Sequence, residues 1–152
     1  MIKNADKTTP YNKMKSKTIL LYEEITFKIR EACRDVWKEF GGAFKEKIVD
    51  RALTLALKKK GLKVELQKRI EIHYLGEKVG VYILDKIINN CVLMEVKCKP
   101  FLIKEDKKQF WHYLKASPYK VGILANFSPR RLEFIRRVYD KAREQELRRK
   151  SA

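Results

Sequence analysis

The chain has 152 residues, of which 45% are hydrophobic, and it carries 36 Lys and Arg against 19 Asp and Glu, a formal net charge of +17. These values predict one folded domain with a single core, and they exclude a disordered chain and a pair of independent domains. No apolar run approaches the roughly 18 to 20 residues of a membrane-spanning helix, and the positive charge favours a polyanionic partner such as nucleic acid or, less specifically, an anionic membrane surface.

The first 17 residues are basic and lack the apolar stretch of a secretory signal, so we expect a basic N-terminal extension and a cytoplasmic protein without a membrane partner. Three cysteines (Cys33, Cys91 and Cys98) form no CxxC pair and lie near no histidine cluster. This spacing argues against a disulfide framework and a zinc site, and it predicts reduced thiols.

Two helices are expected first. Apolar residues recur at helical spacing from Thr18 to Phe40, where Gly41 and Gly42 interrupt the pattern. A second amphipathic stretch runs from Phe44 to Lys60, with three lysines in its last turn and Gly61 at its C-terminal end.

Three strands should follow as an antiparallel meander. Residues 62–75 alternate apolar and polar side chains, with a bulge considered near Gln67. The segment GEKVG turns the chain into VGVYILDKII, and Asn89-Asn90 turns it again into CVLMEVKCK.

Residues 103–117 predict a third helix with Phe110 and Leu114 facing inward. The apolar run YKVGILANF is typical of a central strand that is covered on both faces, and LEFIRRVY predicts a final short strand. Residues 18–139 would form the domain, and residues 140–152 a basic C-terminal tail that could form a frayed helix.

The hairpin of residues 84–99 holds charges among apolar neighbours. Alternation puts Glu95 and Lys97 on one face of their strand, and hairpin geometry can bring Asp85 close to Glu95. Two adjacent carboxylates repel unless a cation lies between them, and Mg²⁺ or Mn²⁺ would suit their oxygen atoms. Lys97 could then position an attacking water, although a bare Glu-x-Lys more often marks a solvent-facing strand edge.

In this topology the pattern resembles the PD-(D/E)xK nuclease superfamily, which has Asp on the second strand and (D/E)xK on the third of an αβββαβ core. From about residue 25 to 138 the chain is similar to the GxxExxY family within it, in the segments FGGA, FKEKIVDRAL, GEKVGVYILD, VLMEVK, QFWHYLKA and KVGILANF. The resemblance implies a restriction-endonuclease-like α/β fold, in which helices flank a mixed central sheet and an extra N-terminal helix is added.

The resemblance also implies an activity, that of a divalent-metal-dependent nuclease hydrolysing phosphodiester bonds in nucleic acid, with DNA expected before RNA. The residues that match the family motifs are Asp85, Glu95 and Glu46 as metal ligands, Lys97 as a further catalytic residue, and Gln109 with Tyr113 as a substrate-binding QxxxY motif. The Val96 carbonyl is a further candidate ligand. The resemblance leaves open whether the protein forms a homodimer, because many small nucleases of this type pair to engage both strands of a duplex.

Departures from the family pattern keep other readings open. Ala43 stands in place of the glycine of the GxxExxY motif, and Val49 stands in place of its tyrosine. Gly42 replaces the proline of the family's LGPG segment, and Trp37 stands where histidine is common. A catalytically inactive nucleic-acid-binding module and a basic accessory subunit with a protein partner are therefore alternatives. Glu46 could also be an ordinary exposed helix residue, and Tyr113 could simply line the core.

Overall fold

The computed structural model describes the backbone of residues 10–139 and the side chains of residues 22–139. The elements, in chain order, are α1 (Pro10–Phe40), α2 (Glu46–Lys59), β1 (Val64–Tyr74), β2 (Glu77–Ile88), β3 (Val92–Lys97), α3 (Lys104–Ala116), β4 (Val121–Phe127) and β5 (Leu132–Val138). This order confirms the expected αβββαβ core with an additional N-terminal helix. None of the helices in the described ranges is both long and apolar enough to cross a membrane.

The first helix is longer than the sequence pattern predicted. It begins at Pro10 and not at Thr18, so residues 10–17 of the expected N-terminal extension belong to α1. Proline suits the first position of a helix because its fixed φ is already helical and no intrahelical partner for its nitrogen is needed there. The helix ends as predicted, because Gly41 adopts a φ of +62° and its N–H donates to the Trp37 carbonyl at 2.7 Å. The expected C-terminal tail lies outside the described residues.

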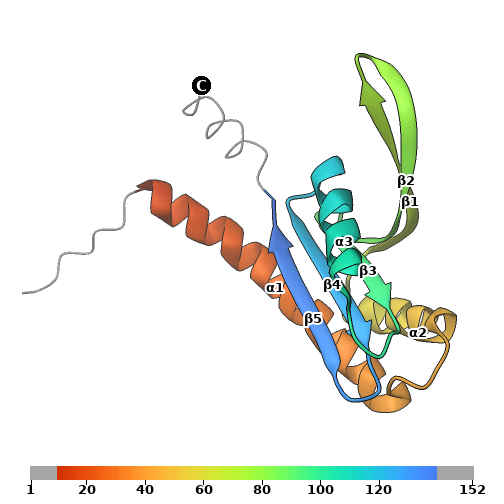
Figure 1. Cartoon of the computed structure of the whole chain (residues 1–152). Coiled ribbons are helices and arrows are strands. Elements are labelled where there is room, and N and C mark those ends of the chain that lie inside the picture. The colour runs from red at the N-terminus through yellow and green to blue at the C-terminus, as the bar shows by residue number, and fades with distance from the viewer. Residues whose placement is uncertain (1–9, 140–152) are drawn as a thin grey trace, which may run out of the picture.

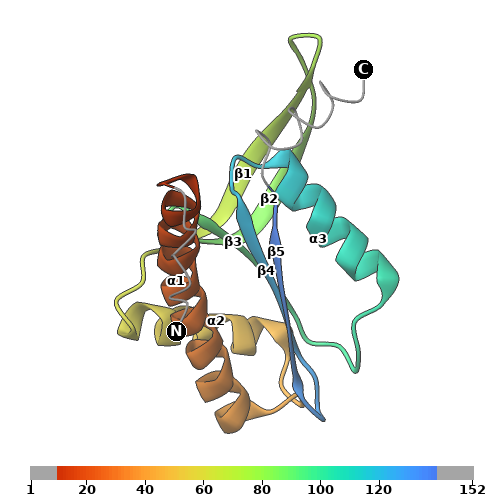
Figure 2. The same ribbon diagram turned by 90° about the vertical axis from the view of Figure 1, so that its left-hand side faces the viewer.

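The five strands form one mixed sheet in the order β1-β2-β3-β4-β5. Strands β3 and β4 are parallel, and the other neighbouring pairs are antiparallel. Helices α1 and α2 lie on one side of this sheet and α3 on the other, as Figure 2 shows from near the sheet edge. Parallel neighbours need a crossover, and α3 supplies it between β3 and β4.

The main core lies between α1, α2 and the sheet, and smaller clusters lie beneath α3. All seven residues of β4 are buried, which confirms the prediction of a strand covered on both faces. In β3, Met94 and Val96 face α1 and α2, whereas Leu93 packs with Leu114 of α3. The predicted alternation along β3 is therefore confirmed, and it directs Glu95 toward the α3 side.

Strand β2 pairs with β3 only at its end. Lys86, Ile87 and Ile88 pair with both β1 and β3, whereas the rest of β2 pairs with β1 alone, in a two-stranded ribbon that projects from the body (Figure 1). Opposite the point of divergence, Gln67 adopts a φ of +52° without a change of register, and the register shift lies instead between Ile72 and His73. Beyond Met94, the edge of β3 is consequently not paired with β2.

Candidate active site

Asp85 and Glu95 meet where β2 leaves β3. The N–H of Asp85 donates to Oε1 of Glu95, and the N–H of Val96 donates to Oδ2 of Asp85, each at 3.3 Å. The ladder between the two strands has opened at this point, so these amides would otherwise lack sheet partners. The open ladder thus accounts for the position of both carboxylates, and the two acids are brought together as the sequence predicted.

The acidic pair is electrostatically strained. Only 5% of Glu95 is exposed. Burial, followed by the negative charge of Asp85 and a side-chain hydrogen bond with it, raises the pKa of Glu95 to about 8, although Lys97 acts in the opposite direction. The pair therefore favours a shared proton or a bound cation over two free negative charges.

Lys97 and Glu46 extend the site from two different elements. Lys97 is the last residue of β3, and Glu46 is the first of α2. Much of Glu46 is exposed, yet desolvation raises the pKa of its carboxyl, Lys97 lowers it, and Asp85 and Asp50 raise it further. Lys97 therefore lies close enough to influence both Glu46 and Glu95.

The predicted Gln109 and Tyr113 pair lies on the α3 side of the site. Gln109 Nε2 donates to the Tyr113 hydroxyl at 3.1 Å, as their four-residue spacing on one helix allows. Desolvation raises the pKa of Tyr113, and the charges of Glu95 and Asp85 add to the effect. The Tyr113 ring also packs on Tyr82 of β2 at 4.8 Å between centroids. Tyr113 is thus both a packing residue and a neighbour of the acids.

A buried ion pair behind the site was missed from the sequence. Lys86 follows Asp85 in β2, is fully buried, and pairs through Nζ with Oδ1 of Asp50 on α2. Asp50 lies one turn after Glu46, so this pair fixes the start of α2 against β2. The available signal was a lysine that directly follows Asp85 inside the otherwise apolar run of residues 81–88.

The donor set fits a hard divalent cation in its chemistry. The two adjacent carboxylates are preferred ligands of Mg²⁺ and Mn²⁺. Val96 directly follows Glu95, and its main-chain carbonyl is a further oxygen ligand of the kind that these cations bind. Among the described side chains, no group of three or more His, Cys, Asp and Glu is arranged to hold a metal ion. Glu46 thus does not join Asp85 and Glu95 in a three-acid cluster.

The segment that departs from the family pattern packs tightly. Trp37 Nε1 donates to the Ser128 carbonyl at 2.8 Å, and Val49 is fully buried in the main core. A Cβ added to Gly42 would lie 2.6 Å from the Pro129 Cα and closer still to the Pro129 nitrogen. Glycine is therefore required at position 42 by the close approach of two backbones.

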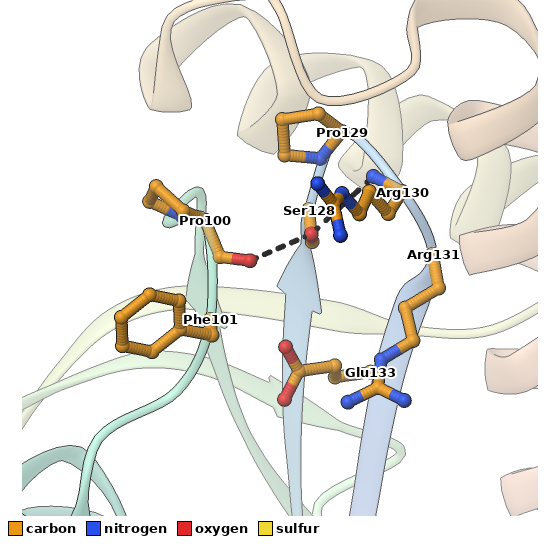
Figure 3. A pocket seen from close by; sticks show the side chains of 7 residues that line it. All are labelled: Pro100, Phe101, Ser128, Pro129, Arg130, Arg131 and Glu133. Carbon is orange, nitrogen blue, oxygen red and sulfur yellow. Dashed lines mark hydrogen bonds between the residues drawn. The ribbon is translucent and has the colours of Figure 1, made fainter.

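A hollow of about 590 Å³ lies beyond the ends of β3 and β4, with Pro100, Phe101 and Ser128 to Arg131 on its walls (Figure 3). Glu133 completes the lining. None of the six predicted site residues lines this hollow. The acidic pair and the hollow are therefore distinct features of the molecule.

The chain is similar to a known protein family. No curated protein matches the chain. A solved structure, SSO0001, superimposes with a TM-score of 0.47 and 25% identity, covering 68% of this chain and 56% of the other, so the chain spans little more than half the length of that protein. The family model for the PD-(D/E)XK nuclease superfamily matches residues 23–138, which include every predicted site residue. The chain belongs to the PD-(D/E)XK nuclease superfamily.

Proposed function

We propose that the protein is a divalent-metal-dependent nuclease that hydrolyses phosphodiester bonds in nucleic acid, with DNA as the first substrate to test. The observation that carries the proposal is the contact between Asp85 and Glu95 at the opening of β2 and β3, with Lys97 beside them. A buried glutamate in contact with a half-buried aspartate and next to a lysine, in a chain of a nuclease superfamily, is better explained by catalysis than by fold stability. The similarity to the GxxExxY family is part of the same proposal, supported by the location of Glu46 near Lys97.

The roles follow from position and charge. Asp85 and Glu95 hold Mg²⁺ or Mn²⁺, with the Val96 carbonyl as a further ligand, and Glu46 acts at the rim of the site through water. The chemistry that a bound cation supplies is polarisation of the scissile phosphate and a lower pKa for water. Lys97 orients the attacking water and offsets the negative charge that develops on the phosphate. Gln109 and Tyr113 contact the substrate phosphate from α3.

The test compares purified wild-type chain with Asp85→Asn and Lys97→Met on single-stranded DNA, double-stranded DNA and RNA, with Mn²⁺, Mg²⁺ or EDTA. We expect metal-dependent cleavage of at least one substrate by the wild type, and a loss of about 100-fold or more in both variants. Lys99→Met is the matched control, because Lys99 lies two residues beyond Lys97, just after β3, but pairs with Asp106. Equal activity in all four proteins would identify a contaminant and refute the proposal.

A second candidate is a nucleic-acid-binding module that retains the fold without turnover. The observation in its favour is that, within residues 22–139, only two of the three predicted acids come together. The buried Val49 also offers no hydroxyl where the family has tyrosine. Salt-sensitive DNA binding without cleavage under any metal condition would select this alternative over the nuclease.

A further inference from the structure

A groove of about 520 Å³ runs between α1 and the edge strand β5, on the opposite side of the sheet from the acidic pair. Its floor contains Trp37, Leu132 and Phe134, and its walls carry five cationic side chains, namely Arg30, Arg34, Lys38, Arg130 and Arg131. No acidic residue lines it. In Figure 1, α1 and β5 run beside each other along this surface.

The charges of α1 are segregated around the helix. Glu31 and Asp35 point to α2, where both lie within ion-pair distance of Lys60. Arg30, Arg34 and Lys38 recur every four residues on the side that faces the groove, about 6 Å apart along the helix axis. Within residues 22–139, none of the five groove cations has an ion-pair partner. Their mutual repulsion is therefore not offset by direct ion pairs among these residues.

The groove is preorganised by contacts of its walls. The Arg30 guanidinium lies 4.5 Å over the Phe134 ring, which holds the side chain at the groove. At the other end, the N–H of Ser128 donates to the Arg131 carbonyl at 3.2 Å, and the Arg130 N–H donates to Ser128 Oγ at 3.4 Å. These bonds fix the turn that carries two of the cations. A ligand would therefore bind side chains that are already ordered, which lowers the entropic cost of binding.

The groove is connected to the catalytic end of the sheet. Lys97 is paired with Asn126 in the β3–β4 ladder, and the turn that begins at Ser128 follows two residues later. Arg130 and Arg131 line both the groove and the hollow at the ends of β3 and β4 (Figure 3). A neighbouring hollow shares Arg30 and Arg34 with the groove, and Glu23, Glu24 and Arg136 also line it.

We propose that the α1–β5 groove binds the sugar–phosphate backbone of a nucleic-acid strand that passes around the 128–131 turn from the catalytic face. Arginine suits this role because its planar guanidinium can hold two phosphate oxygens at once. The inference rests on the proposed function for the identity of the partner, but it does not require hydrolysis.

The test measures binding of fluorescently labelled single-stranded DNA by fluorescence anisotropy. The buffer contains EDTA, so that metal-dependent cleavage does not contribute to the signal. The groove variant is Arg34→Ala/Lys38→Ala/Arg130→Ala, and the matched control is Arg51→Ala/Lys58→Ala/Lys59→Ala, which removes the same charge from exposed positions on α2. Each side chain in both sets is exposed, so both variants should fold, and circular dichroism checks this.

We expect the groove variant to bind about tenfold more weakly or worse, and the slope of log Kobs against log salt to fall by roughly 2 to 3, as expected for three lost phosphate contacts. The control should retain most of the affinity. Equal losses in the two variants would mean that only net charge matters, and no loss in the groove variant would exclude the groove; either result overturns the proposal.

Two further ligands test whether the groove binds a membrane or an acidic protein in place of nucleic acid. Phosphatidylserine vesicles and polyglutamate are offered to the same proteins. If the groove variant loses binding to one of these and keeps its affinity for DNA, the surface serves a membrane or an acidic protein, and the inference fails. If selective loss of DNA binding is seen in a protein that cleaves nothing, the groove stands and the nuclease proposal falls.

Discussion

The main-chain N–H of Asp85 donates to the Glu95 carboxylate, while the Asp85 carboxylate accepts the N–H of Val96, so each acid is held by the other's strand. These bonds occupy the place where the β2–β3 ladder stops. They explain how two carboxylates stay adjacent despite their repulsion, since hydrogen bonds to backbone amides favour charged oxygens.

Glu95 should make the metal-free protein less stable as the pH rises. Because the folded-state pKa of Glu95 is raised to about 8, the folded protein holds a proton that the unfolded chain releases at its ordinary, lower pKa. The stability that this proton contributes is complete below the ordinary glutamate pKa and is lost as the pH rises toward about 8. Urea denaturation in EDTA should show this decline in the wild type and a flatter profile in Glu95→Gln.

The control for that experiment is Glu77→Gln, which alters an exposed glutamate at the start of β2. Its pH profile should follow the wild type. A Glu95→Gln profile as steep as the wild type between pH 5 and pH 8 would mean that Glu95 does not hold the proton.

Cation binding and catalysis should separate in two variants. A divalent cation that binds only the folded protein stabilises it by about 2.7 kcal/mol at 100 times its Kd. Mn²⁺ should therefore raise the Tm of the wild type and of Lys97→Met, because Lys97 is not a ligand. It should not raise the Tm of Asp85→Asn, because that variant lacks a carboxylate ligand. Differential scanning fluorimetry measures this, and an unchanged shift in Asp85→Asn would remove Asp85 from the cation site.

Breaking the buried Lys86–Asp50 pair should be costly. Asp50→Ala leaves the fully buried Lys86 without its partner, and we expect a loss of about 3 to 5 kcal/mol in the free energy of unfolding. Adding Lys86→Met should recover part of this loss, since the unpaired charge is removed. Asp35→Ala, which breaks a partly exposed pair with Lys60, is the control and should cost about 1 kcal/mol or less.

Gly42→Ala should be destabilising, because the new Cβ would overlap the backbone of Ser128 and Pro129. Overpacking of this kind costs about 1 to 3 kcal/mol or more. Gly80→Ala provides the comparison, as a Cβ there meets nothing within 4 Å. Chemical denaturation of the two variants should give clearly different midpoints, and similar midpoints would show that the 128–129 segment can move away at little cost.

Asp106 should stabilise the protein at neutral pH and not in acid. Its carboxylate accepts bonds from Lys99 Nζ at 2.7 Å and from the Ile103 N–H at 3.0 Å. Desolvation pushes the pKa of Asp106 upward, but these bonds and the nearby lysines outweigh it and hold the pKa below its ordinary value.

A lowered folded-state pKa gives stability that is present above the ordinary aspartate pKa of about 3.9 and lost as the pH falls below it. Asp106→Asn should therefore be less stable than the wild type by about 1 to 3 kcal/mol at pH 7, and the gap should narrow near pH 3. A gap that stays constant over this range would assign the effect to packing and not to charge.

Local patterns in the sequence determined most of the fold. The apolar run of β4 predicted burial on both faces, and the Asn89-Asn90 turn was expected, with both residues adopting a positive φ that asparagine tolerates. Alternation along β3 was enough to place Glu95 on the face opposite Met94 and Val96. These features depend on residues within a few positions of each other, which is why sequence periodicity reports them.

Tertiary structure decided how the faces meet. The hairpin register, which the sequence predicted, sets Asp85 opposite Glu95, but only the packing of α2 gives the buried Lys86 its partner Asp50. The α1–β5 groove joins residues about a hundred positions apart, so no local period could indicate it. Alternation and helical spacing specify which way a side chain points, but the neighbour that it meets is set by how separate elements pack.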